Sequence, residues 1–583
     1  MKSTTKPGKH PLVSVLSERR EALISGLVSM AIGLYAVSKY GLVRKYLAGA
    51  ARSMSGSWGN WFYTAYDQDG FITVEKPPLA LWVQATSVRV FGMNKWAILL
   101  PSVLMAAGTA YLTARILQRV AGRLEGLVGG LLMAVMPGMV AIGRSNMADV
   151  YVAYFAALAV YAAIGSLSDW RKSWLVGGSL GLAFLAKGAF AMYPGIAIIC
   201  MLGWMKRDRV KFLALCGLSW LIVGFWWAVI IEFVDPARRP YVAHTRTNSA
   251  LEQLFGWGGL GGARAPVDYP DGFGGRPGWA RLLGEGGDQA LWLLAMAVVG
   301  GLYYVYKTRE SVGRGLVTGS LTWVLVFILT YSYTGRVVHE YYVASIAMPI
   351  VIAAVLGTVE LWKRRKPVLV ALGGVGSIGV ALAYMNLAQP KLLGTATTIA
   401  VGAGAVVAAE AVRRGRGGVL LLGGALLAAG QVTWGVVGAA AVSETWNPVS
   451  RPGFYREAEE DVIPNSFYTT IRENRGSEKY LVAVPSYLYA NEMVYRGEDP
   501  LVTGGFGGEN QQALRLEQFK QMLGRGEVRY VINGGPHRYA EEIEGYLLDT
   551  CTKTRRAGSM NLWDCSVGAV AGTTTNGAGG GRG

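Results

Sequence analysis

The sequence predicts a mainly α-helical bundle that crosses a membrane many times and ends in a small α/β domain. Three observations support this fold class. Of the 583 residues, 52% are hydrophobic, only 16% are charged and the mean hydropathy is +0.31, whereas soluble domains are about one-quarter charged. Apolar stretches of about 20 residues, each long enough to cross a bilayer, recur from residue 22 to residue 442. Beyond residue 442 these stretches end and acidic residues appear.

We predict thirteen membrane spans. They lie at 22–42, 95–116, 124–142, 149–167, 173–189, 190–205, 212–233, 288–306, 315–333, 340–360, 367–386, 393–412 and 418–442. The basic segment 1–20 is expected to stay in the cytoplasm, and the first span is expected to be a retained anchor because no small-residue cleavage site follows it. Every predicted inner loop then carries Lys or Arg, as the positive-inside rule requires. The formal charge of +18 therefore indicates membrane orientation, and we expect a lipid bilayer and no nucleic acid as partner.

The predicted transmembrane domain, residues 21–442, carries two long outer loops at 43–94 and 235–285. The first loop mixes aromatic and charged side chains, namely Trp58, Trp61, Phe62, Tyr63, Tyr66, Asp67, Asp69, Phe71, Glu75 and Lys76. This mixture suits helices that lie in the membrane interface and direct polar groups at a site, and an interfacial aromatic belt is the alternative. The second loop is rich in glycine, which indicates a mobile or tightly turned segment.

Residues 443–567 are predicted to form an extracytoplasmic α/β domain. Three short apolar runs indicate buried strands, at 480–485, 501–505 and 528–534. Residues 511–524 carry apolar side chains at helical spacing. The glycine-rich run 504–508 meets neither the Rossmann nor the Walker spacing and predicts a tight turn. From residue 568 onward the Gly- and Thr-rich tail is predicted to be disordered.

Several cations lie beside the predicted outer loops, where ionisable residues are functional candidates by default. Arg144 and Asp149 flank the junction of the third and fourth spans, and a helix-end ion pair is the alternative there. Lys187 follows a strongly apolar stretch, where a specific anionic partner explains the position better than snorkelling. Further outer cations are Arg238, Arg239, Arg246, Arg336 and His339. Their anion is a lipid headgroup, a phosphorylated donor or the surrounding acidic lipid.

Carboxylates accompany these cations on the same predicted side of the membrane. Asp67, Glu75 and Asp149 fall beside Lys76 and Lys187. A site with both signs suits transfer of a group from a phosphate leaving group to a hydroxyl, because cations stabilise the departing phosphate and a carboxylate accepts the proton. The alternative is a transporter or lipid flippase, which also uses many spans and charges at membrane depth. We find no internal repeat of the kind that many transporters contain.

Motifs along almost the whole chain resemble those of one superfamily. In the first outer loop they read SWGNWFY at 57–63, TVEKPPL at 73–79 and LWV at 81–83. Further matches are RSN at 144–146 with Asp149, GLAFLAKG at 181–188, RPYV at 239–242, TNS at 247–249, GWGGLG at 256–261 and HEYY at 339–342. The C-terminal part adds LVAVPS at 481–486, GGF at 504–506, LEQF at 516–519 and VRY at 528–530. The chain thus resembles the bacterial protein-mannosyltransferase and aminoarabinose-transferase superfamily, which has the membrane glycosyltransferase C fold.

The resemblance implies an enzyme of the cell membrane that takes a sugar from a polyprenyl-phosphate donor outside the cytoplasm. Mannose or another hexose is expected as the sugar, and a protein, lipid or cell-wall polymer as the extracytoplasmic acceptor. The residues that it implies for binding the donor phosphate are Lys76, Lys187, Arg239, Arg336 and His339. Those that it implies for other substrate contacts are Arg144, Asn146, Tyr241 and Asn248.

The catalytic base departs from the pattern of the superfamily. Wider relatives have an acidic residue directly after the first span, where residues 41–46 of this chain read GLVRKY without a carboxylate. We therefore expect Asp67 to be the base, with Asp149 as the second choice, and Asp69 to cap a turn. Glu75 is expected to orient Lys76 or to help hold a divalent metal, because the superfamily is mixed in its metal dependence. No other cofactor is implied.

The four cysteines fall into two pairs with different surroundings. Cys551 and Cys565 are predicted to form a disulfide, because the predicted orientation places both in a compartment that allows oxidation. Cys200 and Cys216 lie within apolar segments and are expected to be buried thiols.

Overall fold

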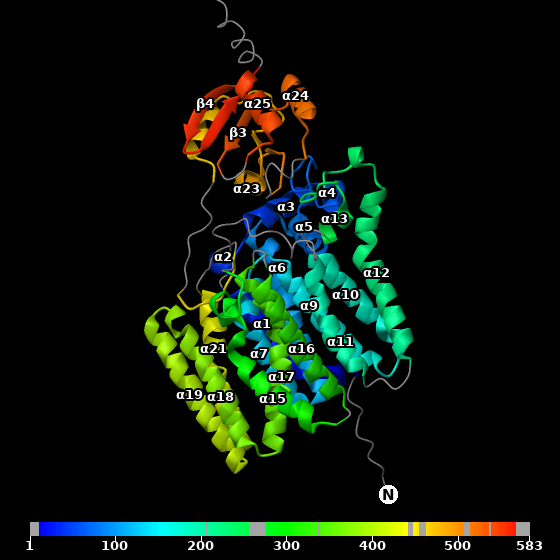
Figure 1. The fold of residues 1–583 in the computed structure, drawn as a ribbon, viewed down its shortest axis with the longest axis vertical. Helices are drawn as coiled ribbons and strands as arrows, with labels where there is room; N and C mark the ends of the chain where they lie inside the picture. The colour runs from blue at the N-terminus through cyan, green and yellow to red at the C-terminus, as the bar shows by residue number, and fades with distance from the viewer. Residues whose placement is uncertain are drawn as a thin grey trace, which may run out of the picture.

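The computed structural model describes ten segments of the chain, residues 11–35, 37–203, 208–255, 276–309, 311–334, 338–440, 447–453, 462–505, 513–535 and 538–566. It consists of a helical bundle with a small α/β domain at one end (Figure 1). The predicted fold class is thereby confirmed. Arg336, the motif at 256–261 and the tail from residue 568 lie outside the described residues.

Within the described residues, seven helices are long and apolar enough to cross a membrane. They are α6 (Lys95–Val120), α9 (Asp149–Ser166), α12 (Arg209–Phe233), α16 (Val312–Tyr333), η7 and α17 together (Glu340–Lys363), α18 with the turn after it (Pro367–Leu387) and α19 (Lys391–Arg414). Two bent pairs raise the number to nine. They are α7 (Arg123–Ala134) with α8 (Pro137–Gly143), bent by 61°, and α20 (Gly417–Leu427) with Ala429–Ala440, bent by 50°.

The predicted number of thirteen spans is therefore not reached by helix length and composition. The predicted break near residue 189 exists, because α10 (Ser173–Lys187) and α11 (Tyr193–Leu202) are separate helices. With 15 and 10 residues, however, each is shorter than the roughly 20 residues that a span requires. The same holds for the 14 residues of α15 (Leu294–Lys307), and α1 (Pro11–Leu34) includes the charged sequence SERRE.

Small residues let neighbouring helices approach closely. A Cβ atom added at Gly177 of α10 would lie 1.9 Å from the carbonyl oxygen of Cys216 in α12, and one at Gly357 of α17 would lie 2.3 Å from the carbonyl carbon of Gly300 in α15. Larger side chains at these positions would force the helices apart. This packing fixes α10 in the bundle and, with it, the position of Lys187 at its end.

The first outer loop folds into three helices, α3 (Lys45–Gly56), α4 (Trp58–Tyr63) and α5 (Leu79–Phe91). Between α4 and α5 the chain turns back, with Ala65 paired to Thr73, and Ile72 pairs with Tyr241 of the second outer loop. Leu42 likewise pairs with Ser145. Segments from three parts of the sequence therefore meet at the end of the bundle that lies under the α/β domain (Figure 1).

The α/β domain contains a five-stranded sheet with the order β2-β1-β3-β5-β4. The first three strands in chain order run parallel, and β5 is antiparallel to β3 and β4. The strands are β1 (Ala483–Val484), β2 (Leu501–Val502), β3 (Tyr530–Gly534), β4 (Thr552–Ala557) and β5 (Met560–Asp564). Four helices accompany them, α22 (Asn465–Glu473), α23 (Tyr487–Arg496), α24 (Leu516–Gly524) and α25 (Glu541–Thr550).

The three predicted strands contain β1, β2 and β3, and the predicted helix contains α24. The β4–β5 hairpin was not predicted, because β4 has the polar sequence TKTRRA and is largely exposed. Cys551 and Cys565 form a disulfide across the open end of this hairpin. Cys216 is buried and Cys200 half-buried.

Candidate functional site

An ion pair between Asp149 and Lys187 forms the centre of the candidate site. Asp149 begins α9 and Lys187 ends α10. The Nζ atom of Lys187 lies 2.5 Å from Oδ1 of Asp149, and the two side chains are 10% and 12% exposed. The other carboxylate oxygen, Oδ2 of Asp149, is buried and has no hydrogen-bond partner among the described residues. Asp149 thus retains an acceptor for a proton or a hydroxyl group.

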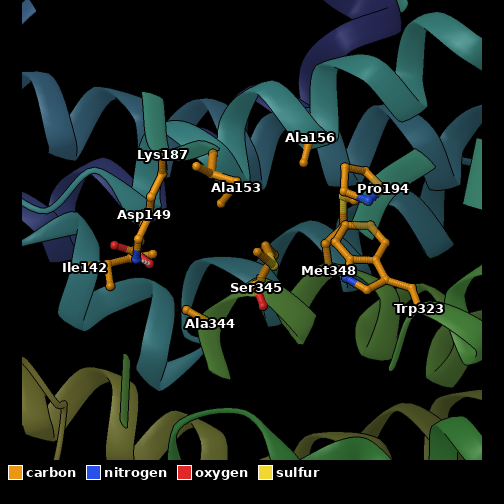
Figure 2. Close-up of a pocket in the computed structure, with 12 residues that line it drawn as sticks. Ile142, Asp149, Ala153, Ala156, Lys187, Pro194, Trp323, Ala344, Ser345 and Met348 are labelled. Carbon is orange, nitrogen blue, oxygen red and sulfur yellow. Dashed lines mark hydrogen bonds and ion pairs between the residues drawn. The ribbon is translucent and has the colours of Figure 1, made fainter. Parts of the chain in front are cut away.

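The ion pair lies at one end of a largely apolar pocket, and Trp323 and Pro194 lie at the other (Figure 2). Its lining comprises Met133, Ile142, Asp149, Val152, Ala153, Ala156, Lys187, Pro194, Trp323, Ala344, Ser345 and Met348. The indole N–H of Trp323 and the hydroxyl of Ser345 are also buried without partners among the described residues. The pocket therefore combines a hydrocarbon-like wall with a few unsatisfied polar groups, which is typical of a ligand site.

Two tyrosines of the HEYY motif surround the ammonium group of Lys187. Its Nζ atom lies 4.1 Å from the ring centroid of Tyr342 and 5.2 Å from that of Tyr341. The ring of His339 stacks on Tyr341 with centroids 5.1 Å apart. The motif thus contributes cation–π contacts that hold Lys187 in the site.

Glu75 and Lys76 form a second ion pair, which follows the paired segment between α4 and α5. The Nζ atom of Lys76 lies 2.7 Å from Oε1 of Glu75, and the hydroxyl of Tyr46 donates to Oε2. Glu75 is buried. Burial opposes its ionisation, but Lys76 and the neighbouring His244 outweigh burial and hold the pKa of Glu75 below its ordinary value. The side chain of Lys76 is 22% exposed, whereas that of Glu75 is 3% exposed.

The two ion pairs and Arg44 belong to one electrostatic cluster. Lys76 and Arg44 both act on Lys187, and all three cations act on His339. Burial first and these cations second keep the pKa of His339 well below its ordinary value, so this ring is neutral at pH 7. The three cations face two carboxylates, which leaves one positive charge on these five side chains. Such a site suits a ligand with one negative charge.

Asp67, the predicted base, makes contacts that hold a turn of the backbone. It is buried, and its two carboxylate oxygens accept hydrogen bonds from the backbone N–H groups of Phe71 and Ile72 at 2.9 to 3.1 Å. Asp67 therefore stabilises the turn for which we expected Asp69 as the cap, and it does not line the pocket. Asp69 instead pairs with Lys479 of the α/β domain at 3.2 Å. This geometry makes Asp149, the second choice from sequence, the better candidate for the base.

Arg144 and Asn146 hold backbone segments together. Arg144 donates to the carbonyl oxygens of Ile32 and Gly33 at the end of α1 at 2.7 and 3.0 Å. The side chain of Asn146 accepts from the backbone N–H of Arg44 and donates to its carbonyl oxygen. In this structure the two residues fix Arg44 and the end of α1 rather than face the pocket.

Arg239, Tyr241 and Asn248 likewise make contacts within the second outer loop. Arg239 donates to the side-chain and backbone oxygens of Asn248 at 2.8 and 2.7 Å. The hydroxyl of Tyr241 donates to the carbonyl oxygen of Thr245 at 2.7 Å. These residues shape the loop whose backbone pairs with residues 71–73.

Sequence reasoning missed several residues around the site. Arg44 and Tyr46 lie in the GLVRKY segment, from which we inferred only that the expected carboxylate is missing. His244 had no motif to mark it. Arg451 pairs with both Asp288 and Glu340 and so fastens the segment next to His339, but 111 residues separate Arg451 from Glu340. No local pattern in the sequence reveals such long-range pairs.

The described residues around Glu75 do not fit a divalent cation. Both oxygens of Glu75 are engaged, by Lys76 and Tyr46, and no three His, Cys, Asp or Glu residues group together in the described part of the chain. The nearest charges are cations, which repel a metal ion. The site is therefore built for an anion.

Two family profiles match the chain in the regions just described. Residues 75–230 match the family described as dolichyl-phosphate-mannose-protein mannosyltransferase, and residues 467–547 match the domain described as "Putative mannosyltransferase YkcB-like, C-terminal". These matches confirm the resemblance noted in the sequence. The matched residues 75–230 include both ion pairs of the candidate site.

Two relatives from Bacillus subtilis (strain 168) are similar over part of their length. "Putative mannosyltransferase YkcB" is 28% identical over 240 residues, which cover 40% of this chain and 34% of the relative. "Putative mannosyltransferase YycA" is 29% identical over 245 residues, 41% of this chain and 36% of the relative. The chain thus spans about a third of the length of these curated relatives.

Among solved structures, ArnT from Cupriavidus metallidurans bound to undecaprenyl phosphate matches with a TM-score of 0.54 at 15% identity. The same protein in its apo state matches with a TM-score of 0.53 at 14% identity. Each match covers 96% of this chain and 99% of ArnT. The bundle and the α/β domain together therefore have the ArnT fold, which confirms the predicted membrane glycosyltransferase C fold.

Proposed function

We propose that this protein is a membrane glycosyltransferase that moves mannose or another hexose from a polyprenyl-phosphate donor to a hydroxyl group of an extracytoplasmic acceptor. The observation that carries this proposal is the cluster of Arg44, Lys76 and Lys187 with Asp149 at the end of an apolar pocket. The family domain, the names of the two relatives and the undecaprenyl phosphate bound to ArnT support the same chemistry.

The charge of the cluster suits the proposed donor. A polyprenyl-phosphate sugar is a phosphodiester and carries one negative charge, which the surplus positive charge of the five side chains neutralises. When the sugar leaves, the phosphate gains a second negative charge. Arg44, Lys76 and Lys187 are then positioned to stabilise the charge that develops on the leaving group. The apolar wall of the pocket suits the hydrocarbon next to the phosphate.

Oδ2 of Asp149, which has no partner among the described residues, is the proposed proton acceptor for the second substrate. In the proposed mechanism Oδ2 accepts the proton of the acceptor hydroxyl, whose oxygen forms a bond to the anomeric carbon of the sugar. The bond between that carbon and the phosphate oxygen breaks, and polyprenyl phosphate leaves with the electron pair. An in-line displacement of this kind inverts the anomeric carbon. The acceptor is a protein, a lipid or a cell-wall polymer on the outer side of the cell membrane.

The test is incubation of the purified protein with radiolabelled polyprenyl-phosphate mannose, glucose, galactose and aminoarabinose, each scored for release of polyprenyl phosphate. We expect release from mannose or another hexose donor, and a loss of release in Asp149→Asn. Absence of release from every donor in the presence of cell-envelope acceptors would overturn the proposal. In that case, movement of a labelled polyprenyl-phosphate lipid across proteoliposomes would support the flippase alternative.

A further inference from the structure

Helix α23 of the α/β domain packs directly on the outer loop that carries Glu75 and Lys76 (Figure 1). Besides a hydrogen bond of Tyr487, four polar contacts fasten it to the bundle. They are Tyr66 to Asn491 at 3.0 Å, Arg52 to the carbonyl oxygen of Tyr495 at 3.2 Å, Gln68 to that of Gly497 at 3.2 Å, and the Lys45–Glu492 ion pair. The domain is therefore not a module on a free linker but is docked at the site.

Tyr487, the first residue of α23, links the domain to the second ion pair. It is fully buried, and its hydroxyl donates to the carbonyl oxygen of Thr73, two residues before Glu75. Its ring lies 5.0 Å from that of Tyr46, between centroids, and Tyr46 donates to Glu75. Tyr66 completes the aromatic cluster, 4.5 Å from Tyr487. The Tyr487 side chain thus contacts the segment that carries Lys76 in two ways. Its hydroxyl bonds to the backbone of Thr73, and its ring packs on Tyr46, which bonds to Glu75.

The topology of the sheet explains why Tyr487 reaches the site. It follows β1, the strand that lies between its parallel neighbours β2 and β3. The carboxyl ends of parallel strands are the edge at which α/β sheets place their functional groups. Here that edge faces the bundle, because Tyr487 meets Thr73 only three residues after β1 ends. Tyr489 then ties α23 to the end of β3 by donating to the carbonyl oxygen of Gly534 at 2.8 Å.

Removal of the Tyr487 hydroxyl would affect the backbone before Glu75. Thr73 is buried, and a buried carbonyl group that loses its donor is unfavourable unless the chain moves to find another donor. Other hydrogen bonds also hold the segment. The backbone N–H groups of Thr73 and Val74 donate to the carbonyl oxygens of Tyr241 and Thr64. Ala243 N–H donates to the Thr73 hydroxyl, the Gln253 side chain to the Val74 carbonyl, and Glu75 N–H to the Tyr46 hydroxyl. A shift of this strand-like segment moves Lys76 relative to the Asp149–Lys187 pair.

We propose that the α/β domain is an integral part of the transferase site, and that Tyr487 is a positioning residue that holds the Thr73–Lys76 segment in place. This inference rests on the proposed function, in which Lys76 binds the donor phosphate. Tyr487 itself touches neither the donor nor the reacting atoms. It acts through the carbonyl group of Thr73 and through the Tyr46–Glu75 contact.

The test compares Tyr487→Phe with Tyr489→Phe in the full-length protein. Each variant removes one buried hydroxyl from α23. The Tyr487 hydroxyl donates to Thr73 of the bundle, whereas the Tyr489 hydroxyl donates to Gly534 within the α/β domain. Two kinds of measurement are made: steady-state kinetics, which give kcat and KM for donor and acceptor, and amide hydrogen exchange in peptides that cover residues 71–79.

We expect Tyr487→Phe to lower kcat by about 10- to 10²-fold with little change in the acceptor KM, because a small displacement of a catalytic group slows the reaction this much. Exchange at residues 73–76 rises in the same variant. Tyr489→Phe lowers the Tm but leaves both quantities at wild-type values.

Equal kcat and equal exchange in the two variants would overturn the inference. A change in the acceptor KM alone would also overturn it, since that result assigns the domain to acceptor binding. The exchange measurement needs no turnover. If the wild-type protein releases no polyprenyl phosphate from any donor, a rise in exchange confined to Tyr487→Phe still supports the positioning role while the proposed function fails.

Discussion

The ammonium group of Lys187 and the carboxylate of Asp149 lie 2.5 Å apart, although 38 residues separate them in the sequence. Asp149 lies at the N-terminus of α9 and Lys187 at the C-terminus of α10. The helix dipole favours a negative charge at the first position and a positive charge at the second. Because α9 and α10 pack side by side in opposite directions, these two ends meet, and the pair closes one end of the pocket.

The role of Asp149 as the base can be tested by Asp149→Asn. This variant keeps the shape of the side chain but cannot accept a proton, so we expect transfer to fall by about 10²–10⁴-fold. Equilibrium binding of the polyprenyl-phosphate sugar should persist. Asp69→Asn is the matched control, because Asp69 is about one-third exposed and pairs with Lys479 outside the pocket. Normal transfer by Asp149→Asn would assign the base to another group.

Lys76→Met and Lys187→Met should each abolish donor turnover and weaken donor binding, because each removes a charge-assisted contact to the phosphate. Arg at either position should restore only part of the activity, since its planar group occupies different space. Lys187→Met also leaves the carboxylate of Asp149 buried without its partner, so its folded yield should fall. The double variant with Asp149→Asn should recover the yield but not the turnover. Wild-type turnover in Lys76→Met would exclude Lys76 from the site.

Asp67→Asn should reduce stability rather than chemistry. The amide replaces one of two oxygens that accept backbone N–H groups, and we expect a loss of about 1–3 kcal/mol in the free energy of unfolding. The measurement is the Tm of the purified protein, with kcat determined at a temperature where the variant is folded. Asp69→Asn again serves as the control. A variant with wild-type Tm and no transfer would restore Asp67 as the base.

His244 should make the protein less stable in mild acid. Burial first, and then the charge of Lys76, lower the pKa of His244 to about 4, although Glu75 opposes this shift. In the unfolded chain the His244 ring binds a proton near pH 6.5, whereas in the folded protein it binds a proton only near pH 4. Stability therefore falls as the pH decreases through this window, by at most about 3 kcal/mol. The measurement is the Tm between pH 4 and pH 7.5.

His244→Asn is the control for this prediction. The backbone of His244 has a φ of +60°, which Asn tolerates better than most residues. The variant lacks the titrating ring, so the decrease in Tm between pH 6.5 and pH 4 should be smaller than in the wild type. An identical decrease in both proteins would assign the acid sensitivity to other groups.

Chelation of divalent metals should leave turnover unchanged. Lys76 and Tyr46 engage both oxygens of Glu75, and the neighbouring charges are positive. We expect equal rates of polyprenyl phosphate release with and without EDTA, in enzyme purified without added metal. Loss of activity with EDTA and its return with Mg²⁺ or Mn²⁺ would show that the donor phosphate brings a metal ion into the site.

The sequence predicted the helical bundle and the α/β domain well, because long apolar runs and short β-rich runs are local signals. The strand β4 was not predicted, because its exposed polar sequence is typical of a loop. Hydropathy also does not reveal that α10 and α11 are short or that α7 and α8 bend by 61°, so the thirteen predicted spans stay a prediction beside the seven to nine helices of the described residues that meet the length and composition of a span. For the site, the motifs contained all four residues of the two ion pairs, but they did not pair Lys187 with Asp149, for which Arg144 was the expected partner in the alternative interpretation.

Residue chemistry by itself indicated that this chain crosses a membrane and that cations and carboxylates gather near the long loops at 43–94 and 235–285. The tertiary structure decided which of these charges meet. Asp67, Arg144 and Arg239 bond to nearby or distant backbone groups, whereas one oxygen of Asp149, beside Lys187, has no partner in the part of the chain that the structure describes. The physical reason is that a carboxylate or guanidinium group has the same chemistry wherever it stands in the sequence. Only the packing of α9, α10, the outer loops and the α/β domain determines whether its partner is the protein backbone or a ligand.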